Sequence, residues 1–293
     1  MSPHLTQRLP RPWAGLLLSI LLLPSCRSEI PPPAPVAEKL ELHVFDCGRL
    51  HFDHIEPFFG IPDEDTDVRD FIVPCYVIEH EKGRLLWEGG LPSELAADPG
   101  WREMEGGWRM RLDQPLAEQL AGLGLSMDAF EFVAFSHFHF DHVGVANELT
   151  GATLLIQRPE FEAAFASEVT VPGFDPEIYN RLAEGEKIIL DGEYDIFGDG
   201  RVRLLSAPGH TPGHQVLFVD LEETGPIVLS GDLYVLPISR REQKVLTVDL
   251  DPTASEESMG KIESLIEETG AELWIGHDLT LFERLTQTGS SFR

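Results

Sequence analysis

The 293-residue sequence has few cysteines, few positive charges and no long apolar run. Its three cysteines, Cys26, Cys47 and Cys75, are too few for a disulfide framework. The longest apolar run, AGLLLSILLL at residues 14–23, is shorter than the roughly 20 residues that span a bilayer. Only 22 Lys and Arg residues stand against 50 Asp and Glu residues. So acidic a chain repels phosphate backbones, which argues against a nucleic-acid partner.

The first 39 residues differ in composition from the rest of the chain. Arg8 and Arg11 precede the apolar run, as in a secretory signal. The run ends in LPSC, which resembles the lipobox of bacterial lipoproteins, and the Pro-rich segment at 28–38 is typical of an extended tether. We therefore predict a lipoprotein signal peptide over 1–25 and a tether over 26–39. A plain cleavable signal is the alternative.

These features predict an exported protein on the periplasmic side of a bacterial membrane, with a lipid anchor at Cys26 as its membrane contact. Loss of residues 1–25 removes two arginines and no acidic residue, which changes the formal charge from −28 to −30. Residues 40–293 are then the folded domain, as one core or two fused repeats. Cys47 and Cys75 could form one disulfide in an oxidising compartment, and two separate buried thiols fit equally well. The sequence leaves the oligomeric state open.

Two successive halves of the domain each contain short strand patterns bounded by turn residues. The strand patterns lie at 40–48, 71–80, 84–90, 130–136, 186–190, 201–210, 215–221, 226–232 and 272–278. Helices are predicted over 114–121 and 255–268, the second with a capping box at Thr253 and Glu256 and a stop at Gly270. Strands followed by helices, twice over, predict an α+β fold, an αββα sandwich with its chemistry on loops at strand ends.

The tetrapeptide HFDH occurs twice, and its neighbours distinguish the copies. The second copy lies in SHFHFDHVG and gives four ligand-type side chains within six residues: His137, His139, Asp141 and His142. A surface loop has no folding reason to collect such side chains, so this loop predicts a metal site.

The first copy has Arg49 where the second has His137, and it adjoins the apolar and acidic loop EPFFGIPDED. We therefore predict a surface or pocket-rim loop for His51 and His54, with Phe58 and Phe59 available to an apolar substrate tail.

Further ligand-type residues follow strand patterns downstream. They are His210 and His214 in SAPGHTPGH, Asp232 in VLSGDLY and His277 in LWIGHD. A sheet whose strand ends converge would bring them to the first cluster, as in an open zinc site.

SHFHFDHVG, SAPGHTPGH, LSGD and WIGHD, in this order, resemble the metallo-β-lactamase superfamily over roughly residues 40–285. The resemblance implies two divalent ions, and seven His and Asp ligands without cysteine point to zinc. It assigns His137, His139 and His210 to one ion. It assigns Asp141, His142 and His277 to the other, with Asp232 bridging them. His214 then has a supporting or structural role.

Within the superfamily, LELHVFDCG, VPCYVIEHEKG, HFHFDH and the GHD ending are similar to the N-acyl homoserine lactonases. This implies a small-molecule lactone opened by a metal-bridged hydroxide, with Asp141 passing a proton to the leaving ring oxygen. The tyrosine that these lactonases carry three residues after the bridging aspartate stands here as Tyr234, two residues after Asp232, as a donor to a substrate oxygen. Glu88 and Gly89 replace the usual Asp-Thr, which leaves the role of Glu88 open.

Four other functions are weighed against a lactonase. A di-iron redox protein of this superfamily usually carries Glu where His139 stands, and a nuclease needs a cationic groove. A glyoxalase-II-like thioesterase, an aryl esterase or an organophosphate hydrolase shares all seven ligands and is the main alternative. A metal-binding module without activity would have lost ligands, and none is missing.

Overall fold

Two β-sheets form the centre of the fold in the computed structural model, which describes Met1, residues 39–98 and residues 100–293. The first sheet has nine strands among these residues, in the order β4-β5-β1-β2-β3-β6-β7-β8, with β14 paired to β1. Its strands are β1 (Glu41–Phe52), β2 (Asp70–His80), β3 (Gly83–Trp87), β4 (Arg102–Met104), β5 (Trp108–Arg111), β6 (Phe132–Ala134), β7 (Thr153–Gln157), β8 (Lys187–Leu190) and β14 (Ser291–Phe292). The predicted signal peptide and nearly all of the tether lie outside the described residues.

The second sheet has five strands among the described residues, in the order β13-β12-β11-β10-β9. They are β9 (Tyr194–Asp195), β10 (Val202–Ser206), β11 (Gln215–Leu221), β12 (Gly225–Leu229) and β13 (Glu272–Trp274). The α-helices are α1 (Glu56–Phe59), α2 (Leu116–Ala121), α3 (Arg158–Ala164), α4 (Pro176–Tyr179), α5 (Pro237–Arg241), α6 (Pro252–Thr269) and α7 (Leu279–Thr288).

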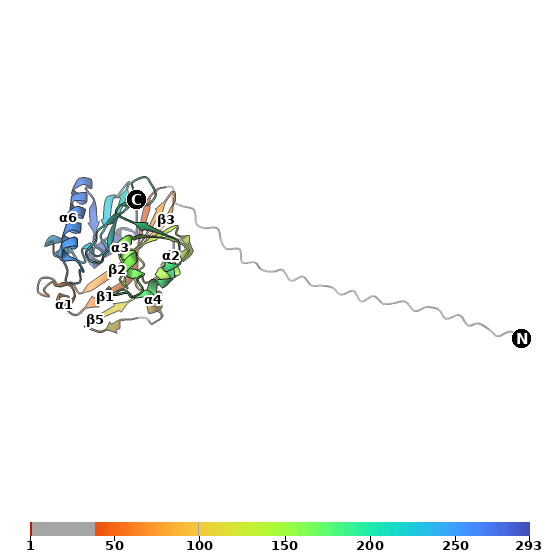
Figure 1. Ribbon diagram of the computed structural model, residues 1–293, viewed down its shortest axis with the longest axis horizontal. Coiled ribbons are helices and arrows are strands. Elements are labelled where there is room, and N and C mark those ends of the chain that lie inside the picture. Colours follow the sequence, from red (N-terminus) through yellow and green to blue (C-terminus); the bar gives the residue numbers. More distant parts are fainter. Residues whose placement is uncertain (2–38, 99) are drawn as a thin grey trace. The chain divides into compact units, whose positions relative to one another are not determined.

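The fold has four layers, namely helices, the first sheet, the second sheet and a helix, and an apolar cluster fills each of the three spaces between them. The first lies between the sheets and joins residues such as Leu85 and Leu155 to Leu217 and Leu229. The second covers the other face of the first sheet with α2, α3 and α4, and the third covers the other face of the second sheet with α6. Figure 1 shows α6 on one flank of the domain and α2, α3 and α4 toward the opposite side. The αββα sandwich predicted from the sequence is confirmed.

Helix α6 begins earlier than the sequence predicts. Its N-cap is Asp251, whose carboxylate accepts hydrogen bonds from the backbone N–H groups of Thr253 and Ala254 at 3.1 and 3.0 Å. The predicted capping box at Thr253 is therefore wrong, because Pro252 fits the first helical turn and the aspartate before it supplies the acceptor. The predicted stop at Gly270 is confirmed by its left-handed backbone, with φ of 71°.

Cys47 and Cys75 form a disulfide, with their Cα atoms 5.8 Å apart. The antiparallel register of β1 and β2 places Phe45 opposite Cys75, and a register shift between Asp46 and Arg49 brings Cys47 into range. Both side chains are buried. The structure thus decides between the two alternatives that the sequence left open.

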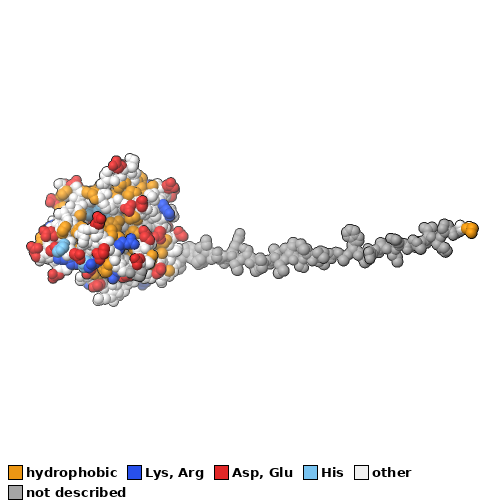
Figure 2. Space-filling model, turned by 90° about the horizontal axis from the view of Figure 1, so that it is seen from below, with side chains coloured by type: hydrophobic (Ala, Val, Ile, Leu, Met, Phe, Trp, Pro, Cys, Tyr) orange, Lys and Arg blue, Asp and Glu red, His pale blue; other side chains and the backbone are white. Residues whose placement is uncertain are grey.

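The surface carries the acidic excess of the sequence. Figure 2 shows Asp and Glu side chains spread over the visible face, with fewer Lys and Arg side chains among them. In the part of the chain that the structure describes, no helix combines the length and apolar content needed to cross a membrane.

Candidate metal centre

Loops at the ends of four strands carry the predicted ligands. The loop after β6 supplies His137 to His142, and single ligands follow β10, β12 and β13: His210, Asp232 and His277. Strands β3 and β6 pair in parallel in the first sheet, and β12 and β13 pair in parallel in the second, so each pair ends at one edge of its own sheet. The loops of the two sheets meet, because residues after β6, β10, β12 and β13 share groups of closely spaced ligand-type atoms.

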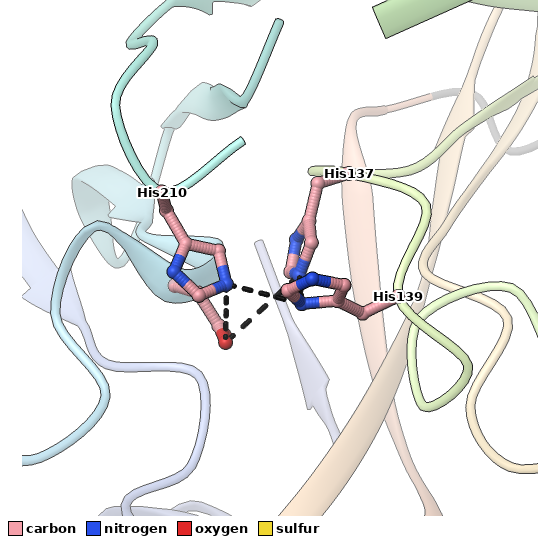
Figure 3. Close-up of side chains that lie close together, drawn as sticks. His137, His139 and His210 are labelled. Atoms are coloured by element: carbon pink, nitrogen blue, oxygen red, sulfur yellow. Dashed lines mark hydrogen bonds and ion pairs between the residues drawn. The ribbon is translucent and has the colours of Figure 1, made fainter. Parts of the chain in front are cut away.

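His137, His139, His210 and Asp232 form the first group of potential ligands. Nε2 of His137 lies 2.8 Å from Nδ1 of His139, which lies 3.1 Å from Nε2 of His210. Figure 3 shows these three rings converging on one point. Oδ2 of Asp232 lies 3.4 Å from Nε2 of His210 and 4.0 Å from Nε2 of His137.

Asp141, His142 and His277 form the second group. Nε2 of His142 and of His277 lie 3.9 and 3.8 Å from Oδ2 of Asp141. Oδ1 of Asp232 lies 3.3 Å from Nε2 of His142 and 3.1 Å from Nε2 of His277. One oxygen of Asp232 therefore faces each group, which is the geometry of a bridging carboxylate.

The residues present fit a pair of divalent ions. Donor atoms at 2.0–2.1 Å from a tetrahedral zinc are about 3.4 Å apart, and the separations within the two groups lie on both sides of that value. Nε2 of His142 and Oδ1 of Asp232 are buried and have no hydrogen-bond partner among the residues that the structure describes. A buried polar atom without a partner is costly, and a bound cation would supply the missing partner for both atoms.

The titratable groups of the site influence one another's protonation. Burial lowers the pKa values of His137 and His139 well below the usual range, so both rings are neutral and able to bind a metal. Burial opposes charge on His142 as well, but Glu88 and Asp232 raise its pKa well above the usual range. Although burial favours a neutral Asp232, the rings of His277 and His142 hold its pKa well below the usual range.

Glu88 contacts the second group through His142. Its carboxylate lies 3.2 Å from Nδ1 of His142 and accepts hydrogen bonds from the backbone N–H of Ser136 at 3.2 and 3.3 Å. Glu88 has a left-handed backbone, with φ of 68°, immediately after β3. The role that the sequence left open is thus a contact that orients His142.

Two further groups orient ligands and were not found from the sequence. Nδ1 of His210 donates to Asp249 at 2.9 Å, and Nδ1 of His277 donates to the backbone carbonyl of Ile72 at 2.7 Å. Each bond fixes the tautomer that leaves Nε2 available to a metal. Ile72 lies 205 residues from His277, and no local pattern links either pair.

His214 uses both of its ring nitrogens within the protein. Nδ1 donates to the carbonyl of Ala207 at 3.1 Å, and Nε2 accepts from the backbone N–H of Asp232 at 3.0 Å. His214 therefore positions Asp232 and has no nitrogen left for an ion.

The turn before Asp232 requires glycine at position 231, because a Cβ there would lie 2.4 Å from Cβ of Ser136.

The structure places Tyr234 away from the cavity beside the two groups. Its side chain is fully buried in the cluster under α6, and its hydroxyl forms hydrogen bonds with the amide of Gln243. Tyr234 does not line the cavity that contains the metal-ligand groups. Tyr234 follows the short turn over η5 (Gly231–Leu233), and its hydroxyl is bonded to Gln243 outside the cavity lining.

A cavity of about 630 Å³ opens beside the two groups. His139, Asp141, His210, Asp232 and His277 lie at its polar end. Its walls are mostly apolar and include Phe52, Phe58, Phe59, Phe71, Trp108 and Phe140.

The first HFDH copy lies outside the two groups. Nδ1 of His51 is 2.7 Å from Asp70, and Nδ1 of His54 is 2.8 Å from Asp63. Neither histidine joins a group of potential metal ligands among the described residues. A third group of ligand-type side chains contains His80, Glu81 and Asp199. It already surrounds the positive charge of Arg201, because Nη2 of that side chain contacts all three.

The fold and the site together define a metal-dependent hydrolase. Residues 68–277 match the sequence model of the metallo-β-lactamase superfamily, and the chain belongs to this superfamily.

Its relatives include proteins named N-acyl homoserine lactonases. The chain is 33% identical over 219 residues to an N-acyl homoserine lactonase, AttM, of Azorhizobium caulinodans, covering 70% of this chain and 81% of the relative. It is 28% identical over 245 residues to the N-acyl homoserine lactonase AiiA of Bacillus thuringiensis subsp. kurstaki, covering 82% of this chain and 93% of the relative. A solved structure of an N-acyl homoserine lactone hydrolase, with the product N-hexanoyl-L-homoserine at its catalytic metal centre, superposes with a TM-score of 0.70. It is 25% identical, and the match covers 83% of this chain and 95% of that chain.

Proposed function

We propose that this protein opens the lactone ring of N-acyl homoserine lactones. The observation that carries the proposal is the position of the two ligand groups at the polar end of a mostly apolar cavity. An N-acyl homoserine lactone has a compact polar head with a hydrolysable ester and a flexible apolar tail. The head fits the polar end and the tail fits the aromatic walls. The relatives that act on such lactones support this choice.

The seven proposed ligands are His137, His139, His210, Asp141, His142, His277 and the bridging Asp232. Zinc is the proposed metal, because imidazole and carboxylate donors at these spacings suit it. Two divalent ions held here would polarise a carbonyl oxygen and activate a water for attack on it.

Residues of the chain would transfer the proton, keep the site available to cations and exclude water. Asp141 lines the cavity and lies among the ligands, so its carboxylate can hold a proton and pass it to the leaving ring oxygen. The buried rings of His137 and His139 stay neutral at neutral pH and keep the site available to cations. The apolar walls, Phe58 and Phe59 among them, exclude water from the acyl tail.

A substrate panel tests the proposal. Metal-reconstituted protein should be assayed with N-acyl homoserine lactones, aryl esters, thioesters and phosphotriesters. We expect the largest kcat/KM for a lactone. Turnover of thioesters or phosphotriesters far above that of every lactone would assign the protein to those hydrolases instead, since they use the same ligand set.

We also propose export and lipidation at Cys26. The disulfide between Cys47 and Cys75 supports an oxidising compartment. Cys26→Ala should release the protein from membranes, and unchanged membrane attachment of this variant would contradict the anchor.

A further inference from the structure

One buried carboxylate outside the ligand set joins two of the loops that carry ligands. Glu160 is the third residue of α3, and its side chain is 2% exposed. Its Oε1 accepts a hydrogen bond from the backbone N–H of Phe138 at 2.9 Å. Its Oε2 accepts from the hydroxyl of Thr211 and the backbone N–H of Gly213, both at 2.8 Å. Each carboxylate oxygen therefore serves one loop.

Two of these three donors adjoin ligands of the first group. Phe138 lies between His137 and His139, and Thr211 follows His210. The spacing of 3.1 Å between Nδ1 of His139 and Nε2 of His210 depends on how the two loops are set against each other. We propose that Glu160 is a positioning residue, whose two carboxylate oxygens hold these loops at the separation that the first metal ion requires.

The local packing is built to admit this carboxylate. A Cβ at position 213 would lie 2.4 Å from the backbone nitrogen of Glu160 and 2.6 Å from its Cβ. Only glycine lets the loop approach α3 this closely. Burial raises the pKa of Glu160 to about 7, against the effect of its three hydrogen bonds, so folding alone does not fully stabilise the anion. A cation held by the adjacent ligands would add the missing stabilisation, and such local conflicts are typical of functional sites.

Glu160→Gln tests the proposal with little change in shape. An amide offers a single acceptor oxygen and turns its NH2 group toward the donors of one loop, so one of the two attachments is lost. Glu162→Gln is the matched control, because it removes the same charge from an exposed position on the same helix. The inference rests on the proposed ligand set and not on the substrate, so metal affinity is measured directly by chelator competition with zinc. The absorption spectrum of the Co²⁺-substituted protein reports the ligand geometry, and thermal unfolding is followed in the metal-free form.

We expect Glu160→Gln to bind the first ion about 10- to 100-fold more weakly than the wild type, the range typical of residues that support metal ligands. Its Co²⁺ spectrum should change, while its metal-free melting temperature stays equal or rises. Glu162→Gln should match the wild type in all three measurements. Unchanged metal affinity and spectrum in Glu160→Gln would overturn the proposal. So would weaker binding in a variant whose metal-free form also melts at a lower temperature, because the carboxylate would then be only a structural residue. Failure of the lactone assay alone would leave this result standing.

Discussion

Removing the carboxylate of Asp249 should weaken metal binding through His210. In the structure, Nδ1–H of His210 donates to Oδ1 of Asp249 at 2.9 Å, and the Asp249 side chain is only 3% exposed. Asp249→Ala leaves this N–H buried without a partner and frees the ring to rotate. Hydrogen bonds to charged groups contribute about 1.5–3 kcal/mol. Loss of a group that orients a metal ligand typically reduces affinity about 10- to 100-fold, which corresponds to about 1.4–2.8 kcal/mol. The two estimates agree.

The assay for Asp249→Ala is chelator competition for each of the two ions in the purified protein. Asp249→Asn is the matched variant, because its amide oxygen can still accept from His210 but carries no charge. We expect about a ten-fold loss or less in Asp249→Asn and a larger loss in Asp249→Ala, confined to the first ion. Wild-type affinity for both ions in Asp249→Ala would refute the reasoning that this bond fixes the ring.

Four further predictions follow from the described contacts. Ionisation of Glu160 should destabilise the metal-free protein by about 3 kcal/mol above pH 7, because its pKa is about 7 when folded and 4.5 when unfolded. Between pH 4.5 and 7, the free energy of unfolding in urea should therefore fall in the wild type relative to Glu160→Gln. The same dependence on pH in both proteins would contradict this. Cys47→Ser should lower the unfolding free energy by about 3.6 kcal/mol, from the 28-residue separation of the disulfide, and equal denaturation midpoints with and without reductant would count against it. Tyr234→Phe should keep lactone turnover within about two-fold while losing about 1 kcal/mol of stability, and a large drop in kcat would restore a catalytic role. Phe58→Ala should raise KM about ten-fold for long-chain lactones, with little change in kcat and little effect on short-chain ones, and equal effects on both would exclude the aromatic wall as the tail site.

Candidate ligands can be recognised in the sequence more easily than the residues that orient them. The dense loop from His137 to His142 is visible in the sequence because ligand-type side chains are rare at such density. Asp249 and Glu160 give no such signal, since an isolated acidic residue in a loop or in a helix is ordinary. Their roles depend on contacts with His210 and Phe138 across 39 and 22 residues.

Side-chain direction and strand register also could not be predicted from the sequence. Tyr234 is near Asp232 in sequence, but one short turn decides which side it faces, and spacing alone does not determine that turn. The disulfide likewise depends on the register of β1 against β2 and on the shift between Asp46 and Arg49. The layers could be predicted because strand and helix periodicities are local properties of the chain.

The most direct test of the account is a titration of metal-free protein with zinc, during which the rate of N-acyl homoserine lactone opening is recorded after each addition. Because Asp232 lies between the two ligand groups, we predict that activity rises until two equivalents per chain are bound and then stays constant. His277→Ala should bind one ion tightly and remain nearly inactive. Full activity at one equivalent, activity without any metal, or two tightly bound ions and full turnover in His277→Ala would contradict a dinuclear lactonase.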